Sequence, residues 1–201
     1  MRKLLIAAWL LLPVGAWAYH EGPGQQGLQL DRVDAALADA RAAADSGDWA
    51  GAATHYEAAL KELPSLETDA LMNASRRIKL SAAKAKLTAS DLIAARSELA
   101  SLVAELSDDE SADPAMLDEA REAHANAQYY YTWLMRLEGY PREEWEPEVE
   151  VARQTYRLLA ERAGERGNES VAKTHMEDLE STIKLARIDL EELQGLPLPS
   201  Q

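Results

Sequence analysis

The sequence predicts an all-α protein made of antiparallel helical hairpins. Apolar side chains recur every three or four residues along most of the chain, which is the spacing of one buried helix face. No segment shows the strict alternation of apolar and polar residues that a half-buried strand requires. Alanine and leucine abound and phenylalanine is absent, which favours closely packed helices over sheets.

Seven helices are expected, one for each periodic segment. In chain order they span residues 30–45, 48–63, 66–88, 90–107, 114–138, 146–165 and 168–194. Gly47 should end the first helix and Pro64 the second. Asp113 precedes Pro114, so an N-cap side chain stands before a proline whose missing N–H costs nothing in the first turn. Pro147 is expected in the first turn of the sixth helix for the same reason.

The N-terminus has the pattern of a secretory signal peptide. Arg2 and Lys3 precede an apolar stretch and a run of small residues that ends at Ala18. A basic start, an apolar centre and a small-residue cleavage site are typical of an export signal. The apolar stretch is shorter than the ~20 residues that span a bilayer. We therefore expect residues 1–18 to be removed, and the protein to be periplasmic or secreted.

The composition excludes several classes of function. The formal net charge is −14, and it becomes more negative when the signal peptide is removed. Such a charge repels the phosphates of nucleic acids and the head groups of anionic lipids. Cysteine is absent, so disulfides, thiolate metal sites and cysteine nucleophiles are excluded.

The most specific motif joins a tight turn to a helix that carries small and aromatic residues on one face. Its members are Gly47, Trp49, Ala52, Tyr56, Ala59 and Pro64. Small residues let two helices approach closely, the aromatic ring fills the space between hairpins, and proline stops the helix. This pattern resembles the second half of a tetratricopeptide repeat. A weaker copy begins at Asp91, and looser copies at residues 152–159 and 172–179 place Tyr156 and Met176 on the inner face.

The resemblance implies a short α-solenoid of about three helical hairpins over residues 30–194. The last helix, 168–194, would cap the array. Residues 19–29, rich in glycine and glutamine, and residues 195–201, with two prolines, are expected to be flexible. By resemblance, the function would be non-catalytic binding of a protein or peptide in the cell envelope.

The predicted third helix is basic in an acidic chain. Between Asp69 and Asp91 it carries no acidic residue, and its basic residues are Arg76, Arg77, Lys79, Lys84 and Lys86. One interpretation is that they neutralise acids on neighbouring helices. The other follows from the resemblance, because tetratricopeptide proteins use asparagine and basic side chains to hold the carboxylate of a partner's extended C-terminus. Arg41, Asn73 and Arg77, with Lys84, are the candidate residues for that contact.

Three consecutive tyrosines form the densest aromatic region. They cover too wide an arc of a helix to enter one core face, so at least one should be exposed. Tyr129 and Tyr131 are therefore candidates for an aromatic contact surface. The alternative is that Tyr130, Trp133 and Leu134 pack inward while the others cover neighbouring helices.

No residue pattern indicates catalysis or metal binding. His55, His124 and His175 lie in predicted helices, lack a histidine or cysteine partner on the same face, and are expected to be exposed. Phosphate-binding loops, nucleophile motifs and dinucleotide motifs are absent, so we expect neither a cofactor nor an enzyme. A structural or oligomerising helical bundle is the alternative to a binding module, and a metal or small-ligand carrier is the third interpretation.

Overall fold

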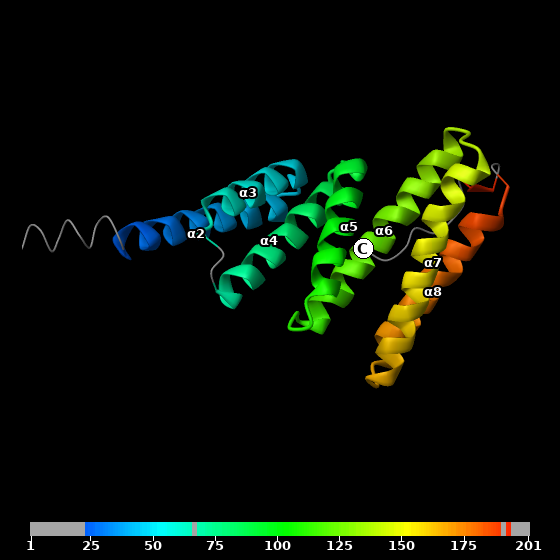
Figure 1. Ribbon diagram of the computed structural model, residues 1–201. Helices are drawn as coiled ribbons and strands as arrows, with labels where there is room; N and C mark the ends of the chain where they lie inside the picture. Colours follow the sequence, from blue (N-terminus) through cyan, green and yellow to red (C-terminus); the bar gives the residue numbers. More distant parts are fainter. Residues whose placement is uncertain (1–22, 66–67, 190–191, 194–201) are drawn as a thin grey trace, which may run out of the picture. The chain divides into compact units, whose positions relative to one another are not determined.

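The computed structural model describes residues 23–65, 68–189 and 192–193. It is built from α-helices, and its described part contains no strand (Figure 1). The helices are α2 (Pro23–Asp45), α3 (Trp49–Glu62), α4 (Asp69–Thr88), α5 (Leu92–Asp108), α6 (Pro114–Leu137), α7 (Arg142–Glu165) and α8 (Glu169–Arg187). The all-α prediction is therefore confirmed. The predicted signal peptide, 1–18, and tail, 195–201, lie outside the described residues.

The chain divides into two compact units, residues 1–82 and 83–201, and the boundary falls within α4. In the first unit α2 packs along α3 as a hairpin. Its core forms around Val33 of α2, Ala59 of α3 and Ile78 of α4. Half-buried Tyr56, the aromatic residue of the repeat motif, packs against this core.

The second unit contains the last turns of α4 and all of α5 to α8. Consecutive helices pack against each other, α5 on α6, α6 on α7 and α7 on α8 (Figure 1). One core cluster is built around Tyr156 with Ala125, Ala152 and Leu179. A second cluster contains Tyr129, Met135, Trp145, Val149, Leu185 and Leu193. Consecutive packing of this kind is consistent with a solenoid-like arrangement of hairpins.

The hairpin turns repeat one design. A residue with positive φ ends the first helix of three hairpins: Gly47 at 81°, Ser90 at 69° and Gly167 at 72°. The next residue in each case is an aspartate or asparagine that begins the second helix. Backbone N–H groups of both residues donate to the last carbonyls of the first helix, which satisfies acceptors that would otherwise be unpaired. The turn at Gly47 therefore recurs at Ser90 and Gly167 with the same backbone geometry.

Two helices start earlier than expected. α2 begins at Pro23 instead of near Leu30, so residues 23–29 of the segment predicted to be flexible are helical. α7 begins at Arg142, with Pro141 at its N-cap, and Pro147 lies inside the helix. The side chain of Trp145 is buried in the core, and this burial offsets the loss of one backbone hydrogen bond at the proline.

The last helix ends earlier than expected. α8 stops at Arg187 rather than at residue 194, and Ile188 has an extended backbone. The guanidinium of Arg136 on α6 donates to the carbonyls of Leu185 and Ile188, the latter at 2.6 Å. Leu193 then folds back into the core, where its carbonyl accepts from the Trp133 indole at 3.4 Å. The position where α8 ends is therefore set by contacts from α6, a helix distant in the sequence.

The repeat pattern predicts the inner faces of three helices, but in α8 it is right for Leu179 and wrong for Met176. Ala52 and Ala59 in α3, Ala95 and Leu99 in α5, and Ala152 and Tyr156 in α7 are fully buried. In α8 Met176 is 47% exposed, so its predicted place on the inner face is wrong. The buried residues there are His175, Asp178, Leu179, Ser181, Thr182 and Leu185.

Candidate functional site

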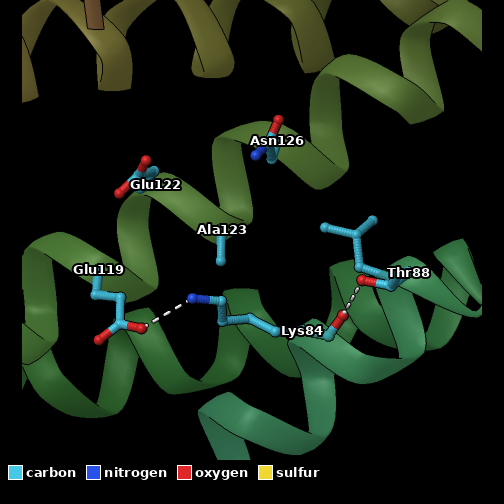
Figure 2. A pocket seen from close by; sticks show the side chains of 7 residues that line it. Lys84, Thr88, Glu119, Glu122, Ala123 and Asn126 are labelled. Atoms are coloured by element: carbon cyan, nitrogen blue, oxygen red, sulfur yellow. Dashed lines mark hydrogen bonds and ion pairs between the residues drawn. The ribbon is translucent and has the colours of Figure 1, made fainter. Parts of the chain in front are cut away.

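A groove runs along α6 in the second unit. Its first half is a cavity of about 280 Å³ between α6 and the last turns of α4 (Figure 2). The lining residues are Lys84, Leu87, Thr88, Glu119, Glu122, Ala123 and Asn126. The four α6 residues are three or four positions apart and therefore share one side of the helix. The small side chain of Ala123 leaves room for the cavity.

Polar side chains surround this first cavity. The Lys84 ammonium lies 2.9 Å from Oε1 of Glu119, and Thr88 donates from its hydroxyl to the Lys84 carbonyl. Figure 2 shows Glu119 and Ala123 pointing toward Lys84, whereas Glu122 and Asn126, which also line the cavity, point away from Lys84. The Lys84–Glu119 pair is half exposed, so opening it to admit a ligand costs little free energy.

The second half of the groove is apolar. A cavity of about 290 Å³ shares Leu87 and Thr88 with the first and continues along α6. Its other lining residues are Ser90, Leu92, Tyr130, Trp133 and Leu134. Residues 119 to 134 of α6 thus form one stripe that changes from charged to apolar. We call the two cavities together the α6 groove.

Behind the polar half, side chains of α6, α7 and α8 form a buried polar cluster. The hydroxyl of Tyr156 donates to Oδ1 of Asn126 at 3.3 Å, and its ring lies 6.5 Å from that of His175. Burial raises the pKa of Tyr156, and nearby Asp178 raises it further. Burial also raises the pKa of Tyr129 to about 12. The tyrosines are therefore neutral hydrogen-bonding groups at any physiological pH.

Glu122 is the titratable member of the groove. Burial raises the pKa of its carboxyl group, and the neighbouring His175 and Lys84 side chains oppose this shift only in part. Burial favours the neutral form because a carboxylate loses its hydration. A raised pKa in the folded state means that Glu122 contributes stability at low pH, and that this contribution is lost as the pH rises through the folded-state pKa.

We therefore expect Glu122→Gln to stabilise the protein at pH 7.5 and to have a smaller effect at pH 4. Glutamine keeps the shape of the protonated acid and removes the charge that burial disfavours. Urea unfolding at both pH values measures the difference. Glu161→Gln is the matched control, because this side chain lies on the exposed surface of α7 in a weak ion pair with Arg157, and it should change stability little at either pH. A Glu122→Gln protein less stable than wild type at pH 7.5 would contradict this interpretation.

Of the predicted binding residues, Lys84 lies in the groove. Arg41, Asn73 and Arg77 are exposed residues of the first unit, on α2 and α4. Arg77 already has an interaction partner. A cavity of about 530 Å³ in that unit is lined by residues of other segments, Gln29, Leu30, Leu63, Pro64, Ser65, Thr68 and Leu71. This cavity does not involve Arg41, Asn73 or Arg77, and the carboxylate clamp stays a prediction.

The tyrosine prediction needs correction. Tyr129 is fully buried and contacts Tyr130 edge to face, so it cannot belong to an exposed contact surface. Tyr131 is half-buried beneath the Arg96 guanidinium, 4.4 Å from the ring centre. Leu134, which one alternative placed inside, is 38% exposed. None of these three tyrosines is fully exposed, because α6 packs against both α5 and α7.

The histidine prediction is wrong for His175. This side chain is 5% exposed, and its Nδ1 atom has no hydrogen-bond partner in the described part of the chain. His55 and His124 are half-buried, and burial lowers the pKa of His124. Among the described residues no group of three or more histidine, aspartate or glutamate side chains is arranged to hold a metal ion.

Comparison with protein-family models, curated proteins and solved structures gave no match. No helix within the described ranges is long and apolar enough to cross a membrane. The α6 groove contains a charged half and an aromatic half, and such an arrangement suits recognition of a ligand with a polar and an apolar part.

Sequence reasoning named Lys84 but missed the rest of the groove. The helical spacing of the groove residues could have indicated it, because they recur every three or four positions along one side of a helix. These residues are Glu119, Glu122, Asn126, Tyr130 and Trp133. The pattern alone does not show which sides of α6 are covered. Tyr129 and Tyr130 are neighbours in the sequence, yet only Tyr130 lines the groove.

Proposed function

We propose that this chain is a non-catalytic helical-repeat protein of the cell envelope, similar to tetratricopeptide proteins, that binds an extended peptide segment in the α6 groove. The observation that carries the proposal is the continuous stripe on α6, charged at Glu119 and Glu122 and apolar at Tyr130, Trp133 and Leu134. An extended peptide presents side chains of both kinds within a short length. The two adjoining cavities fit individual side chains rather than a folded domain.

Charge favours a basic peptide. Lys84 and Glu119 neutralise each other, and Glu122 leaves the polar half negative when ionised. The chain as a whole carries −14, so a cationic segment is attracted over a longer distance than the groove itself. The predicted partner segment therefore contains an apolar side chain next to lysine or arginine.

A phage library of linear peptides tests this proposal. We expect enrichment of peptides with an aromatic or aliphatic residue beside a basic one. Leu134→Glu should lower the affinity for an enriched peptide at least tenfold, because it places a charge in the apolar half of the groove. Fluorescence polarisation with a labelled peptide measures the affinity.

Leu158→Glu on α7 is the matched control. Leu134 and Leu158 are each 38% exposed, so both substitutions replace a leucine of equal exposure with a charge. Leu158→Glu should leave peptide affinity within about twofold of wild type. An equal loss of peptide affinity in both variants would overturn the peptide-binding proposal. So would a selection that enriches no peptide beyond those selected on an unrelated acidic protein.

An oligomerising subunit is the second candidate function. Val151 and Leu158 favour it, because both are exposed and lie two turns apart on the same side of α7. In that case Leu158→Glu should convert the oligomer to monomer in sedimentation velocity, whereas Leu134→Glu should not. The same pair of variants therefore separates the two functions.

A further inference from the structure

The apolar half of the α6 groove adjoins the last described residue of the chain. Leu193 is buried in the core, and its carbonyl oxygen accepts from the Trp133 indole at 3.4 Å. Tyr130 and Trp133 pack against the same core cluster as Leu193, and both also line the groove. The residues that follow Leu193 in the sequence therefore start next to this cavity.

Residues 194–201, which follow Leu193, have a sequence that suits an apolar cavity. They read Gln-Gly-Leu-Pro-Leu-Pro-Ser-Gln, with no charged residue in an otherwise strongly acidic chain. Prolines that alternate with leucines favour an extended polyproline II backbone over a helix. That backbone repeats every three residues, so it places Leu196 and Pro199 on one edge, about 9 Å apart.

The lining of the cavity is complementary to such a segment. None of its lining residues is charged, and two of them, Tyr130 and Trp133, are aromatic. Aromatic-lined grooves are a recurring binding surface for proline-rich segments, because the polyproline II backbone is already extended and loses little entropy on binding. Leu134 on the groove wall is 38% exposed, so a segment that covers it removes apolar surface from water.

We propose that residues 196–199 bind in the apolar half of the α6 groove of the same chain. The short connection favours this occupant over the same segment of a second copy. Only Gln194 and Gly195 separate Leu193 from Leu196, and three residues of extended chain span about 10 Å at most. A short tether keeps the segment at a local concentration on the order of millimolar, which a second molecule in dilute solution does not reach.

Binding of residues 196–199 also regulates the groove, and this second step rests on the proposed peptide-binding function. The segment and a peptide ligand compete for the apolar half, whereas Lys84, Glu119 and Glu122 in the polar half stay accessible. The apparent affinity for a peptide is then reduced by the fraction of molecules in which the apolar half is open.

A spin label tests the binding in the full chain without any peptide. The sequence contains no cysteine, so Ser200→Cys provides a single attachment point for a nitroxide. We expect strong broadening of the amide signals of Ser90, Leu92 and Leu134. A mixture of spin-labelled chains with isotope-labelled chains that lack the nitroxide separates the two occupants. Broadening of the same signals in the mixture would show binding between copies and would overturn binding within one chain.

Substitutions distinguish binding from mere proximity of the label. Leu196→Asp places a charge in the apolar contact and should remove most of the broadening. Gln201→Asp is the matched control, because it adds the same charge outside residues 196–199, and it should retain the broadening. Equal broadening in the two variants would mean that the label reaches the groove only because it is tethered nearby, and the proposal would be wrong.

Peptide affinity tests the competition separately. Leu196→Asp should bind an enriched peptide at least about threefold more tightly than wild type, and Gln201→Asp should differ from wild type by less than about twofold. The control also measures how far an added negative charge alone attracts a basic peptide. Unchanged affinity in Leu196→Asp would overturn the competition. A library that enriches no peptide would reject the proposed function, whereas the broadening decides the binding of residues 196–199 in either case.

Discussion

Tyr156→Ala should lower the free energy of unfolding of the second unit by about 3–5 kcal/mol. The Tyr156 side chain is fully buried among Ala125, Ala152 and Leu179. Three helices meet at this ring, and two of its neighbours are alanines that cannot expand into the space. The substitution therefore leaves a cavity that the surroundings fill poorly.

Two further variants separate packing from hydrogen bonding at Tyr156. Tyr156→Phe keeps the ring and removes the hydroxyl that donates to Asn126, so we expect a loss of only about 1 kcal/mol. Tyr140→Ala, at a 44% exposed tyrosine, should change stability by less than about 0.5 kcal/mol. Guanidinium unfolding followed by tryptophan fluorescence measures all three. A loss of below 1 kcal/mol for Tyr156→Ala would show that this ring is not part of a packed core.

Arg136→Leu should destabilise the same unit by about 2–4 kcal/mol. The guanidinium donates to the carbonyls of Leu185 and Ile188 and lies 4.9 Å from the centre of the Trp145 ring. Leucine fills part of the volume but leaves both carbonyls without this donor at the end of α8. We expect the end of α8 to lose amide-exchange protection before the rest of the helix does.

Arg142→Leu is the matched control for Arg136. Arg142 also lies over Trp145, at 5.9 Å, and otherwise pairs with Glu146 on an exposed surface. Arg142 does not bind the carbonyls at the end of a helix, so its substitution should lower the free energy of unfolding by less than about 1 kcal/mol. If both variants had the same effect, the contact with the ring rather than the cap on α8 would be the stabilising interaction.

The starts of several helices can be predicted from the local sequence alone. Asp48 accepts from the Gly51 N–H and Asp113 from the Ala115 N–H, as capping residues next to a turn are expected to do. These interactions lie within three residues, so the sequence contains all the information about them. The end of α8 differs because its donor, Arg136, stands far away in the chain.

The α6 groove also combines features that the local sequence predicts with features that depend on distant helices. The helical spacing of its residues and the presence of Lys84 can be read from the sequence, and so can the basic character of α4. Which of Tyr129, Tyr130 and Tyr131 is buried depends on the helices that cover α6, and none of those contacts is local. The carboxylate clamp of Arg41, Asn73 and Arg77 was inferred from a resemblance, and it remains untested.

The sequence by itself determined that this protein is helical, where most turns fall, and which residues begin the helices, because apolar periodicity and capping act over a few residues. Only the tertiary structure decided that His175 is buried, that α7 begins at Arg142, ahead of Pro147, and that Asp118 pairs with three arginines. Each of these depends on burial or charge contributed by helices distant in sequence. Long-range packing can outweigh local preference because burying one large side chain is worth more than most propensity differences.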